Sequence, residues 1–279
     1  MRAPLLPALT VLVLAVALGL ADALHLVAGA AAAPAGPPVE VFGASFAEYD
    51  AGAGMWVLRG SPVVVAWGAA RLEAAEVRYD ERRAVAEASG GVVLRQEMLV
   101  LRAARAAAWL RRHLVRAEEG VEVTAHLGAD EARLTAAWAE TDLARRQVAA
   151  GGDPVLTFRQ MRLAGVRLEF DAAAEVVTAA GDADLTLPEE RLQAGRIEAR
   201  LVDERATAEQ DVRVCAGDLL AQAPLAALDG RAGVVTLSGG VVVRRGSDTL
   251  TAEMVTVDLR ARRMTATGRP RLTLGGPGQ

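Results

Sequence analysis

A short apolar phrase that contains glycine recurs along this chain at nearly constant spacing. The chain has 279 residues, and the recurrent glycines are Gly60, Gly90, Gly120, Gly151, Gly181, Gly239 and Gly268, at steps of 30, 30, 31, 30, 58 and 29. The step of 58 spans two units, and the missing copy falls at 207–214, where Asp211 stands near the expected glycine. A fixed period of this length indicates an array of one repeated unit.

The second half of the unit has a signature of its own. Residues 72–80 read Leu-x-Ala-x-x-Val-x-Tyr-Asp, and related phrases return at 134–142, 163–171 and 250–258. Apolar residues two apart face one side of a strand, and the spacing of three in the middle shifts that phase as a bulge or bend would. The final Asp suits a turn, because its side chain can bond nearby backbone. Each unit therefore predicts roughly two strands of eight to ten residues.

The fold class that follows is all-β, a repeat-built domain of about sixteen stacked antiparallel strands. The alanine- and arginine-rich stretch 101–110 favours a helix by propensity. Its sister units carry strands at the same place, so we predict a strand here. We assign the repeat domain to 55–274, a linker or first strand to 34–54 and a short tail to 275–279.

Residues 1–33 are different in composition. Arg2 precedes an apolar run over 8–20, and small residues follow over 29–34, which is typical of a secretory signal peptide. A retained membrane anchor is the alternative, because the apolar character resumes beyond Asp22. Both interpretations predict export across the inner membrane.

Composition and charge argue against several classes of function. The net charge is −4, and arginines are interleaved with carboxylates, which argues against nucleic-acid binding. The densest basic run, 111–116, is interpreted as a solvated strand face. The single cysteine, Cys215, cannot form an internal disulfide, and we expect it to be a small core or edge residue.

Candidate catalytic groups are few. His113 and His126 have no paired-ligand spacing, and no G-x-S-x-G elbow is present. The carboxylate pairs at 118–119 and 189–190 stand beside turn signals and are interpreted as solvated turns. We therefore predict a protein that is not an enzyme and has no catalytic residue, no metal and no cofactor.

A stacked sheet of this kind provides an inner apolar face and two open edges. The inner face runs the length of the array, where it suits acyl chains. Unpaired backbone groups at the edges can accept a strand from a neighbouring protein.

The repeated phrases resemble a known family. The phrase around Gly90 and Val92, together with 72–80 and its copies, resembles the OstA-like repeat of the periplasmic lipopolysaccharide-transport proteins LptA and LptC and of the N-terminal domain of LptD. The resemblance covers about 57–274, and each single motif is degenerate.

That resemblance implies a β-jelly-roll or β-taco whose interior shields the acyl chains of lipopolysaccharide or a related glycolipid. It also implies edge-to-edge pairing with other bridge proteins or further copies of the chain. A cleaved signal favours an LptA-like soluble bridge, and a retained anchor favours an LptC-like component. Our candidate groove residues are the large apolar residues of the strand phrases, and a closed core is the alternative for each: Val65, Trp67, Leu72, Val77, Tyr79, Leu163, Leu168, Phe170, Leu250, Val255 and Val257.

Two other functions stay open. The first is an envelope scaffold that polymerises through its edges and carries no lipid. The second is a carbohydrate-active parallel β-helix, in which Asp80, Asp142, Asp171 and Asp258 would form a row of acidic groups.

Overall fold

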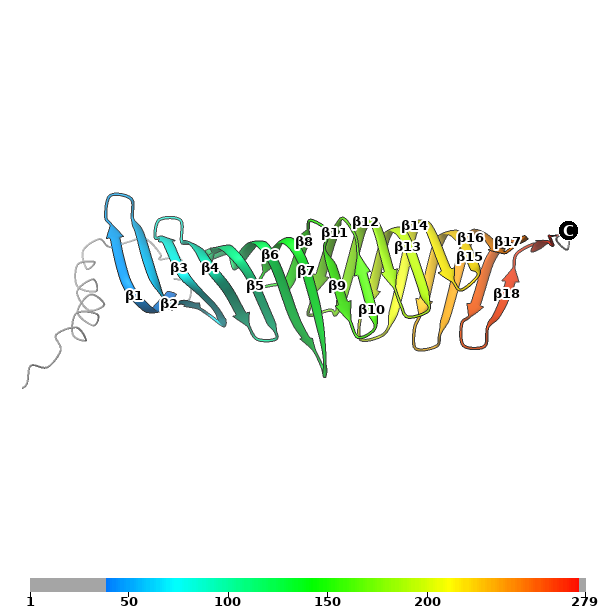
Figure 1. Ribbon diagram of the computed structural model, residues 1–279, viewed down its shortest axis with the longest axis horizontal. Coiled ribbons are helices and arrows are strands. Elements are labelled where there is room, and N and C mark those ends of the chain that lie inside the picture. Colours follow the sequence, from blue (N-terminus) through cyan, green and yellow to red (C-terminus); the bar gives the residue numbers. More distant parts are fainter. Residues whose placement is uncertain (1–38, 276–279) are drawn as a thin grey trace, which may run out of the picture. The chain divides into compact units, whose positions relative to one another are not determined.

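Antiparallel strands follow one another through residues 39–275, the part of the chain that the computed structural model describes. Strands that are neighbours in sequence pair with each other, and Figure 1 shows them stacked in chain order. The predicted signal segment 1–33 lies outside the described residues. The strands are β1 (Val39–Asp50), β2 (Met55–Trp67), β3 (Ala70–Asp80), β4 (Val85–Gln96), β5 (Leu99–Trp109), β6 (Leu114–Leu127), β7 (Asp130–Asp142), β8 (Gln147–Gly151), β9 (Val155–Phe158), β10 (Met161–Ala164), β11 (Arg167–Asp171), β12 (Val176–Thr186), β13 (Glu190–Arg200), β14 (Arg205–Ala216), β15 (Leu219–Asp229), β16 (Val234–Arg245), β17 (Asp248–Asp258), β18 (Arg263–Thr267) and β19 (Arg271–Thr273).

The all-β prediction is confirmed. Of the 19 strands, β8 and β9 both pair with β7, β10 and β11 both pair with β12, and β18 and β19 both pair with β17. Joining each of these three pairs leaves 16 strands, the predicted number. β1 falls in the segment predicted as a linker or first strand. The stretch 101–110, helical by propensity, lies mostly in β5, so the repeat pattern overrides local preference there. Within residues 39–275, no helix is long and apolar enough to cross a membrane.

Most strands are longer than predicted, because they continue through a bend. β4 has 12 residues, and at its middle Gly90 and Gly91 both have left-handed backbone, with φ of 82° and 84°. β3 and β4 pair at Glu73 with Val93 and again at Glu76 with Ser89. Between these two pairs β4 has three residues and β3 has only two. An extra residue on one strand is a β-bulge, and it bends the strand.

The same device recurs along the sheet and explains the period. We call this row of bends the corner. It consists of consecutive left-handed pairs, which are Gly90-Gly91, Glu119-Gly120, Gly152-Asp153, Gly181-Asp182, Gln210-Asp211, Gly239-Gly240 and Gly268-Arg269. Glycine dominates because it has no Cβ to clash when φ is positive. The phase shift predicted in 72–80 lies in β3, the strand that pairs with the bulged strand β4.

Two of the recurrent glycines have another role. Gly60 and Gly151 are not left-handed. An added Cβ would meet the carbonyl oxygen of Gly43 at 2.3 Å in the first case and the indole ring of Trp138 at 2.5 Å in the second. These positions therefore need glycine for close approach.

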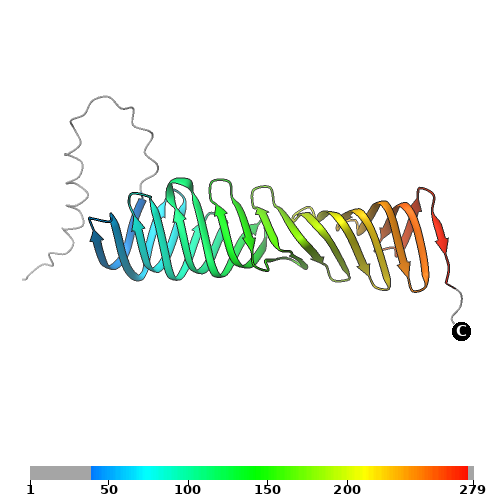
Figure 2. The same ribbon diagram turned by 90° about the horizontal axis from the view of Figure 1, so that it is seen from above.

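The turns lie along two rims. At the long-turn rim the connections have four residues each, at 51–54, 81–84, 110–113, 143–146, 172–175, 201–204, 230–233 and 259–262. At the short-turn rim they have two or three, at 68–69, 97–98, 128–129, 159–160, 187–189, 217–218 and 246–247. Each strand runs from one rim through the corner to the other, so bending at the corner folds the sheet into two layers (Figure 2). We call the side where the two rims meet the seam.

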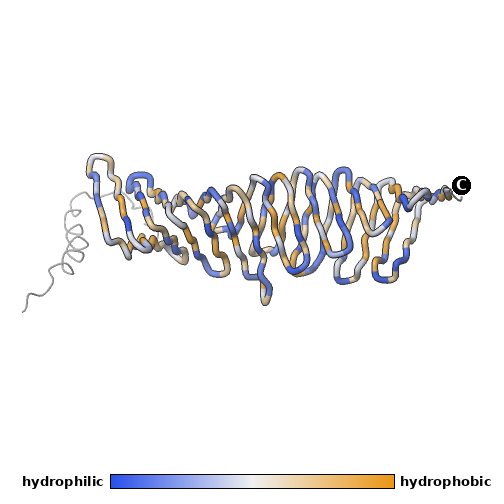
Figure 3. Tube along the Cα trace, viewed as in Figure 1, coloured by the Kyte–Doolittle hydropathy of each residue, from blue (hydrophilic) through white to orange (hydrophobic). Residues whose placement is uncertain are grey.

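Apolar side chains of both layers form one core between them. In β4, Ala86 and Ala88 are buried before the corner and Val92 and Leu94 after it, while Glu87 and Arg95 are exposed. Figure 3 shows that hydrophobic and hydrophilic residues alternate along the strands and that many residues of the turns are hydrophilic. The core continues through every strand from β2 to β17 as one cluster.

The pair Gln210-Asp211 is the corner copy without glycine, which provides a test of the bend. Gln210 has φ of 70°, and left-handed backbone costs a residue with a Cβ about 1–2 kcal/mol. We expect Gln210→Gly to raise the free energy of unfolding by about 0.5–1 kcal/mol, after the greater chain entropy of glycine is subtracted. Chemical denaturation followed by circular dichroism measures the change.

The matched variant is Gly240→Gln. It places the same side chain at a left-handed position (φ 95°) where an added Cβ meets nothing within 4 Å. It should lower the free energy of unfolding by about 1–2 kcal/mol. Equal stability of both variants and the parent would contradict this account of the corner.

Candidate functional site

All eleven predicted groove residues lie on the inward face of the sheet. Eight of them are buried, with exposed fractions of 0–2%. These are Val65, Trp67, Leu72, Val77, Leu163, Leu168, Phe170 and Val255. Tyr79, Leu250 and Val257 are half-buried against the same core. The sequence therefore placed the inward face correctly.

These residues form a packed core in this structure rather than an open trough. Leu72, Leu163 and Leu168 are completely buried and belong to the single apolar cluster between the layers. An acyl chain can reach this interior only where the layers separate or where the sheet ends. Contact between lipid and these eleven residues stays a prediction.

A hydrogen-bond ladder runs along the long-turn rim. In each long turn after the one at 51–54, the backbone N–H of the first residue donates to the carbonyl oxygen of the last residue of the preceding long turn. Leu143 N–H donates to His113 at 2.8 Å, and Leu201 N–H donates to Glu175 at 2.9 Å. We call these first residues the lid positions. They are Glu81, Leu110, Leu143, Ala172, Leu201, Gly230 and Leu259.

Leucines at the lid positions cover the seam. Leu110, Leu143 and Leu201 are buried, and Leu259 is half-buried against the core. Burying a leucine stabilises by about 1.5–3 kcal/mol relative to leaving it exposed. The cover is thin at Ala172 and Gly230, where the side chain is small or absent.

Polar contacts join the two rims across the seam. The side-chain amide of Gln96 donates to the carbonyl oxygen of Leu143 at 3.0 Å, and Glu97 pairs with Arg146. Exposed pairs of this kind contribute about 0–1 kcal/mol each, so they align the rims more than they stabilise them.

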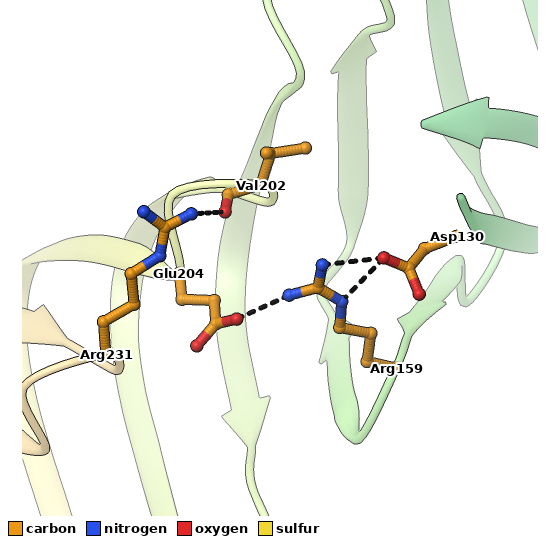
Figure 4. A network of polar contacts seen from close by, with 5 residues as sticks. All are labelled: Asp130, Arg159, Val202, Glu204 and Arg231. Carbon is orange, nitrogen blue, oxygen red and sulfur yellow. Dashed lines mark hydrogen bonds and ion pairs between the residues drawn. The ribbon is translucent and has the colours of Figure 1, made fainter. Parts of the chain in front are cut away.

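A second contact of this kind is centred on Arg159 (Figure 4). Its guanidinium donates to Asp130 at 2.7 Å, which lies on the same rim, and to Glu204 of the long-turn rim. Beside it, Arg231 donates to the carbonyl oxygen of Val202 at 2.6 Å and links two long turns. Arg159 therefore fastens the seam just before Gly230.

Cavities occur at both thin places of the lid. One of about 550 Å³ is lined by Gly230, Leu201 and Leu259 of the long-turn rim and by residues 158–161, 185 and 187–190 opposite. A smaller one of about 20 Å³ lies beside Ala172, and the buried Thr141 that lines it has a hydroxyl without a hydrogen-bond partner in the described part. The large cavity thus lies where the lid residue is glycine, whereas the space beside Ala172 is large enough for about one water.

The two ends of the core are not capped by the described residues. On β1, Val41 lies opposite the buried Val65 and is 39% exposed. On β19, Leu272 lies opposite Leu250 and is 59% exposed. The outer sides of β1 and of β18 and β19 have no partner strand within residues 39–275. Each end therefore exposes both an apolar face and an open strand edge.

Tyr49 marks the N-terminal end. Its ring stacks on Trp56 with centroids 4.6 Å apart, and its hydroxyl donates to Glu81, the first lid residue. That hydrogen bond raises the pKa of Tyr49. A charged lid residue with polar partners distinguishes this end from the leucine-covered middle.

The aspartates predicted for turns are confirmed in that role. Asp80, Asp142, Asp171 and Asp258 each accept backbone N–H groups of the long turn that follows. A hydrogen bond from Gln147, then one from the Ala174 N–H, lowers the pKa of Asp171. Because these strands are antiparallel, the parallel β-helix with a catalytic row of aspartates is wrong.

Other candidate groups have structural roles or none. Cys215 is exposed on β14, inside the sheet, so the prediction of a core or edge residue is wrong. Its neighbours along the strand, Val214 and Ala216, alternate with it, and Val214 takes the inward position. His113 is the left-handed last residue of a long turn. Within residues 39–275, no group of three His, Cys, Asp or Glu side chains is placed to hold a metal ion.

The lid positions were missed by sequence reasoning, although a signal exists. Leu143 and Leu259 each follow a phrase-ending aspartate directly, at the place where Gly230 follows Asp229. Each is the first residue of a turn that follows a strand, so the sequence alone predicts an ordinary loop residue at this position. Only the folded sheet shows that this residue points back over the core.

Comparison with known proteins gives limited information. No protein-family model and no curated protein matches the sequence. Among solved structures, the chain is similar to the crystal structure of LptH, the LptA homologous periplasmic component of the conserved lipopolysaccharide transport device from Pseudomonas aeruginosa, at 16% identity and a TM-score of 0.28. That match covers 54% of this chain and 95% of LptH. At this TM-score the similarity carries no argument about function.

The turn aspartates predict a pH dependence. The pKa of Asp171 is lowered by Gln147 and the Ala174 N–H, and the pKa of Asp229 is lowered mainly by the Ala232 N–H. A folded-state pKa below the unfolded one gives stability above the ordinary aspartate pKa of about 3.9, and this stability is lost as the pH falls through the folded value. The double variant Asp171→Asn, Asp229→Asn keeps an acceptor oxygen but does not titrate. Its melting temperature should fall less than the parent's from about pH 6 to about pH 3.

The control is Asp203→Asn, at an exposed carboxylate to which no hydrogen bond is assigned in the described part. Thermal melts across the pH range test the difference. A double variant that follows the parent curve would refute the link between these turns and acid sensitivity.

Proposed function

We propose that this protein is a non-enzymatic bridge component that carries glycolipid acyl chains across the periplasm, in the manner of the lipopolysaccharide-transport proteins its repeats resemble. The cargo is lipopolysaccharide or a related glycolipid. The proposal is supported by the repeat array, the apolar interior and the open strand edges.

The observation that carries this proposal is a continuous apolar interior that ends uncovered at both sheet edges. The core extends from β2 to β17 in one cluster, and its inward face continues onto exposed residues, Val41 at one end and Leu272 at the other. An array that only needed to be stable would cap these faces with polar residues. Continuity from edge to edge is what a path for an apolar chain requires.

Entry of a chain requires the layers to part at the seam. The ladder hydrogen bonds link successive long turns of one rim and do not cross the seam. The seam is closed by the lid residues and by side-chain contacts such as Gln96 with Leu143, worth about 0.5–1.5 kcal/mol net for a hydrogen bond. The corner is continuous backbone, so separation begins on the seam side. A unit with Ala172 or Gly230 at the lid opens at less cost than one with Leu143.

Pairing between molecules follows from the ends. β1 offers 12 residues of unpaired backbone edge, and β18 and β19 offer a shorter, interrupted edge at the other end. Strand addition at such edges joins sheets through main-chain hydrogen bonds. Joining one chain's β19 end to another's β1 end makes the two interiors continuous.

An envelope scaffold without cargo is the second candidate, and the packed interior favours it. Side chains such as Leu72 and Leu168 are completely buried without any ligand. A scaffold uses the same open edges but never opens its seam. The signal segment that would decide between a soluble and a membrane-anchored bridge lies outside the described residues, and N-terminal sequencing of the exported protein distinguishes the two.

Photo-crosslinking separates carriage from scaffolding. A photoreactive amino acid at Phe170, which is buried on β11, should label glycolipid in cells, because the cargo replaces the facing layer during transport. The same probe at the neighbouring exposed Glu169 is the matched control and should label no glycolipid. Labelling of protein alone at Phe170, with no lipid in detergent-free preparations by mass spectrometry, would favour the scaffold.

Edge pairing predicts a concentration-dependent association. Val41→Arg places a charge on the inward face at the N-terminal end, where a joining partner would bury it. Sedimentation should show a shift towards monomer. Phe42→Arg, on the opposite face of β1 and similarly exposed at 44%, should associate like the parent. Equal loss in both variants would contradict an interface built on the inward face.

A further inference from the structure

A cavity at the seam beside Gly230 has the features of a separate ligand site. Its volume is about 550 Å³, within the range of about 300–1,000 Å³ typical of small-molecule sites. The missing side chain at Gly230 leaves the lid open between Leu201 and Leu259. The floor consists of apolar side chains from both layers, which are Phe158, Met161, Leu185, Leu201, Leu228 and Leu259.

The two lips of this cavity carry opposite charge. Arg200 and Arg260 line it from the long-turn side, and neither pairs with a carboxylate within 4.0 Å in residues 39–275. By contrast, Arg159 and Arg205 are already paired, with Glu204 and Asp229. The site therefore has two guanidinium groups available for an anion.

The opposite lip is acidic. Glu189 is the last residue of the short turn 187–189 and Glu190 is the first residue of β13, and neither forms an ion pair within residues 39–275. Burial, and then the neighbouring Glu189, raises the pKa of Glu190. A purely anionic head group at this mouth would satisfy the arginines but leave two carboxylates beside it. A head group with both charges satisfies both lips.

We propose that this mouth binds a zwitterionic single-chain amphiphile, with its alkyl chain on the apolar floor, its phosphate at Arg200 and Arg260 and its ammonium at Glu189 and Glu190. Charge-assisted hydrogen bonds to phosphate are the strong contacts of such a site. The inference goes beyond transport along the interior, because the mouth is a lateral site with its own head-group preference and is independent of whether the interior carries cargo.

Binding by three probes tests the head-group preference. The full chain, purified and stripped of lipid, is titrated with lauroyl lysophosphatidylethanolamine, dodecyl phosphate and dodecylamine, whose chains all have twelve carbons, below their micellar concentrations. The zwitterionic probe should bind tightest, by about tenfold over the other two. Equal affinity for all three would overturn the proposal, because it would mean that the charged residues at the mouth do not discriminate between head groups.

Variants at the lid locate the site. Gly230→Leu restores the leucine found at sister positions and should reduce binding of the zwitterionic probe by about tenfold or more. The matched control is Ala172→Leu, which fills the other thin lid position and should leave binding unchanged. Unchanged binding in Gly230→Leu, or an equal loss in both variants, would overturn the assignment.

Charge variants keep the test independent of the lid turn, since an added Cβ at Gly230 meets the carbonyl oxygen of Glu204 at 2.9 Å and shifts that turn. Arg260→Gln should weaken both phosphate-bearing probes and spare dodecylamine. Glu189→Gln should weaken both amine-bearing probes and spare dodecyl phosphate. Arg244→Gln, an exposed arginine away from the mouth, is the control. Loss of all probes in either charge variant, or of none, would overturn the proposed head-group arrangement. Crosslinking at Phe170 reports separately on the interior.

Discussion

The pair of left-handed residues at the corner, which recurs once in each unit from β4 onwards, is the constraint on which the rest of this structure depends. A flat antiparallel array of this length would expose both faces to water. Inserting one extra residue at the same point of each unit bends every strand at the corner, and the apolar sides of the two halves then face each other. Because the bend recurs in register, the enclosed core is continuous.

The corner and the seam close the folded sheet by different means. The corner is held by covalent backbone and by strand pairing on both sides. The seam is held by the lid residues and by scattered contacts between the rims, such as Gln96 with Leu143. In a repeat array the stability of each unit depends mainly on its neighbours. Local opening of the seam therefore disturbs little beyond the adjacent units.

The sequence predicted what repeats within one unit. The glycine period marked the corner, the phase shift in 72–80 marked the facing strand, and the aspartates marked the long turns. The helical propensity of 101–110 was overridden correctly, because its neighbours impose strand pairing. The inward positions of residues such as Leu72 and Phe170 followed from alternation alone.

What the sequence did not predict depends on contacts across the seam. Residues that meet there are far apart in the chain, 49 residues for Glu97 and Arg146 and 45 for Arg159 and Glu204. That offset is set by the tilt of the strands, which periodicity does not encode. For the same reason the sequence predicts ordinary turn residues at the lid positions. That glycine at position 230 leaves the lid thin is evident only once the opposite rim is in place. Small changes in sequence at the seam can therefore alter its lid and cavity without altering the fold, since the strands and the corner are specified elsewhere.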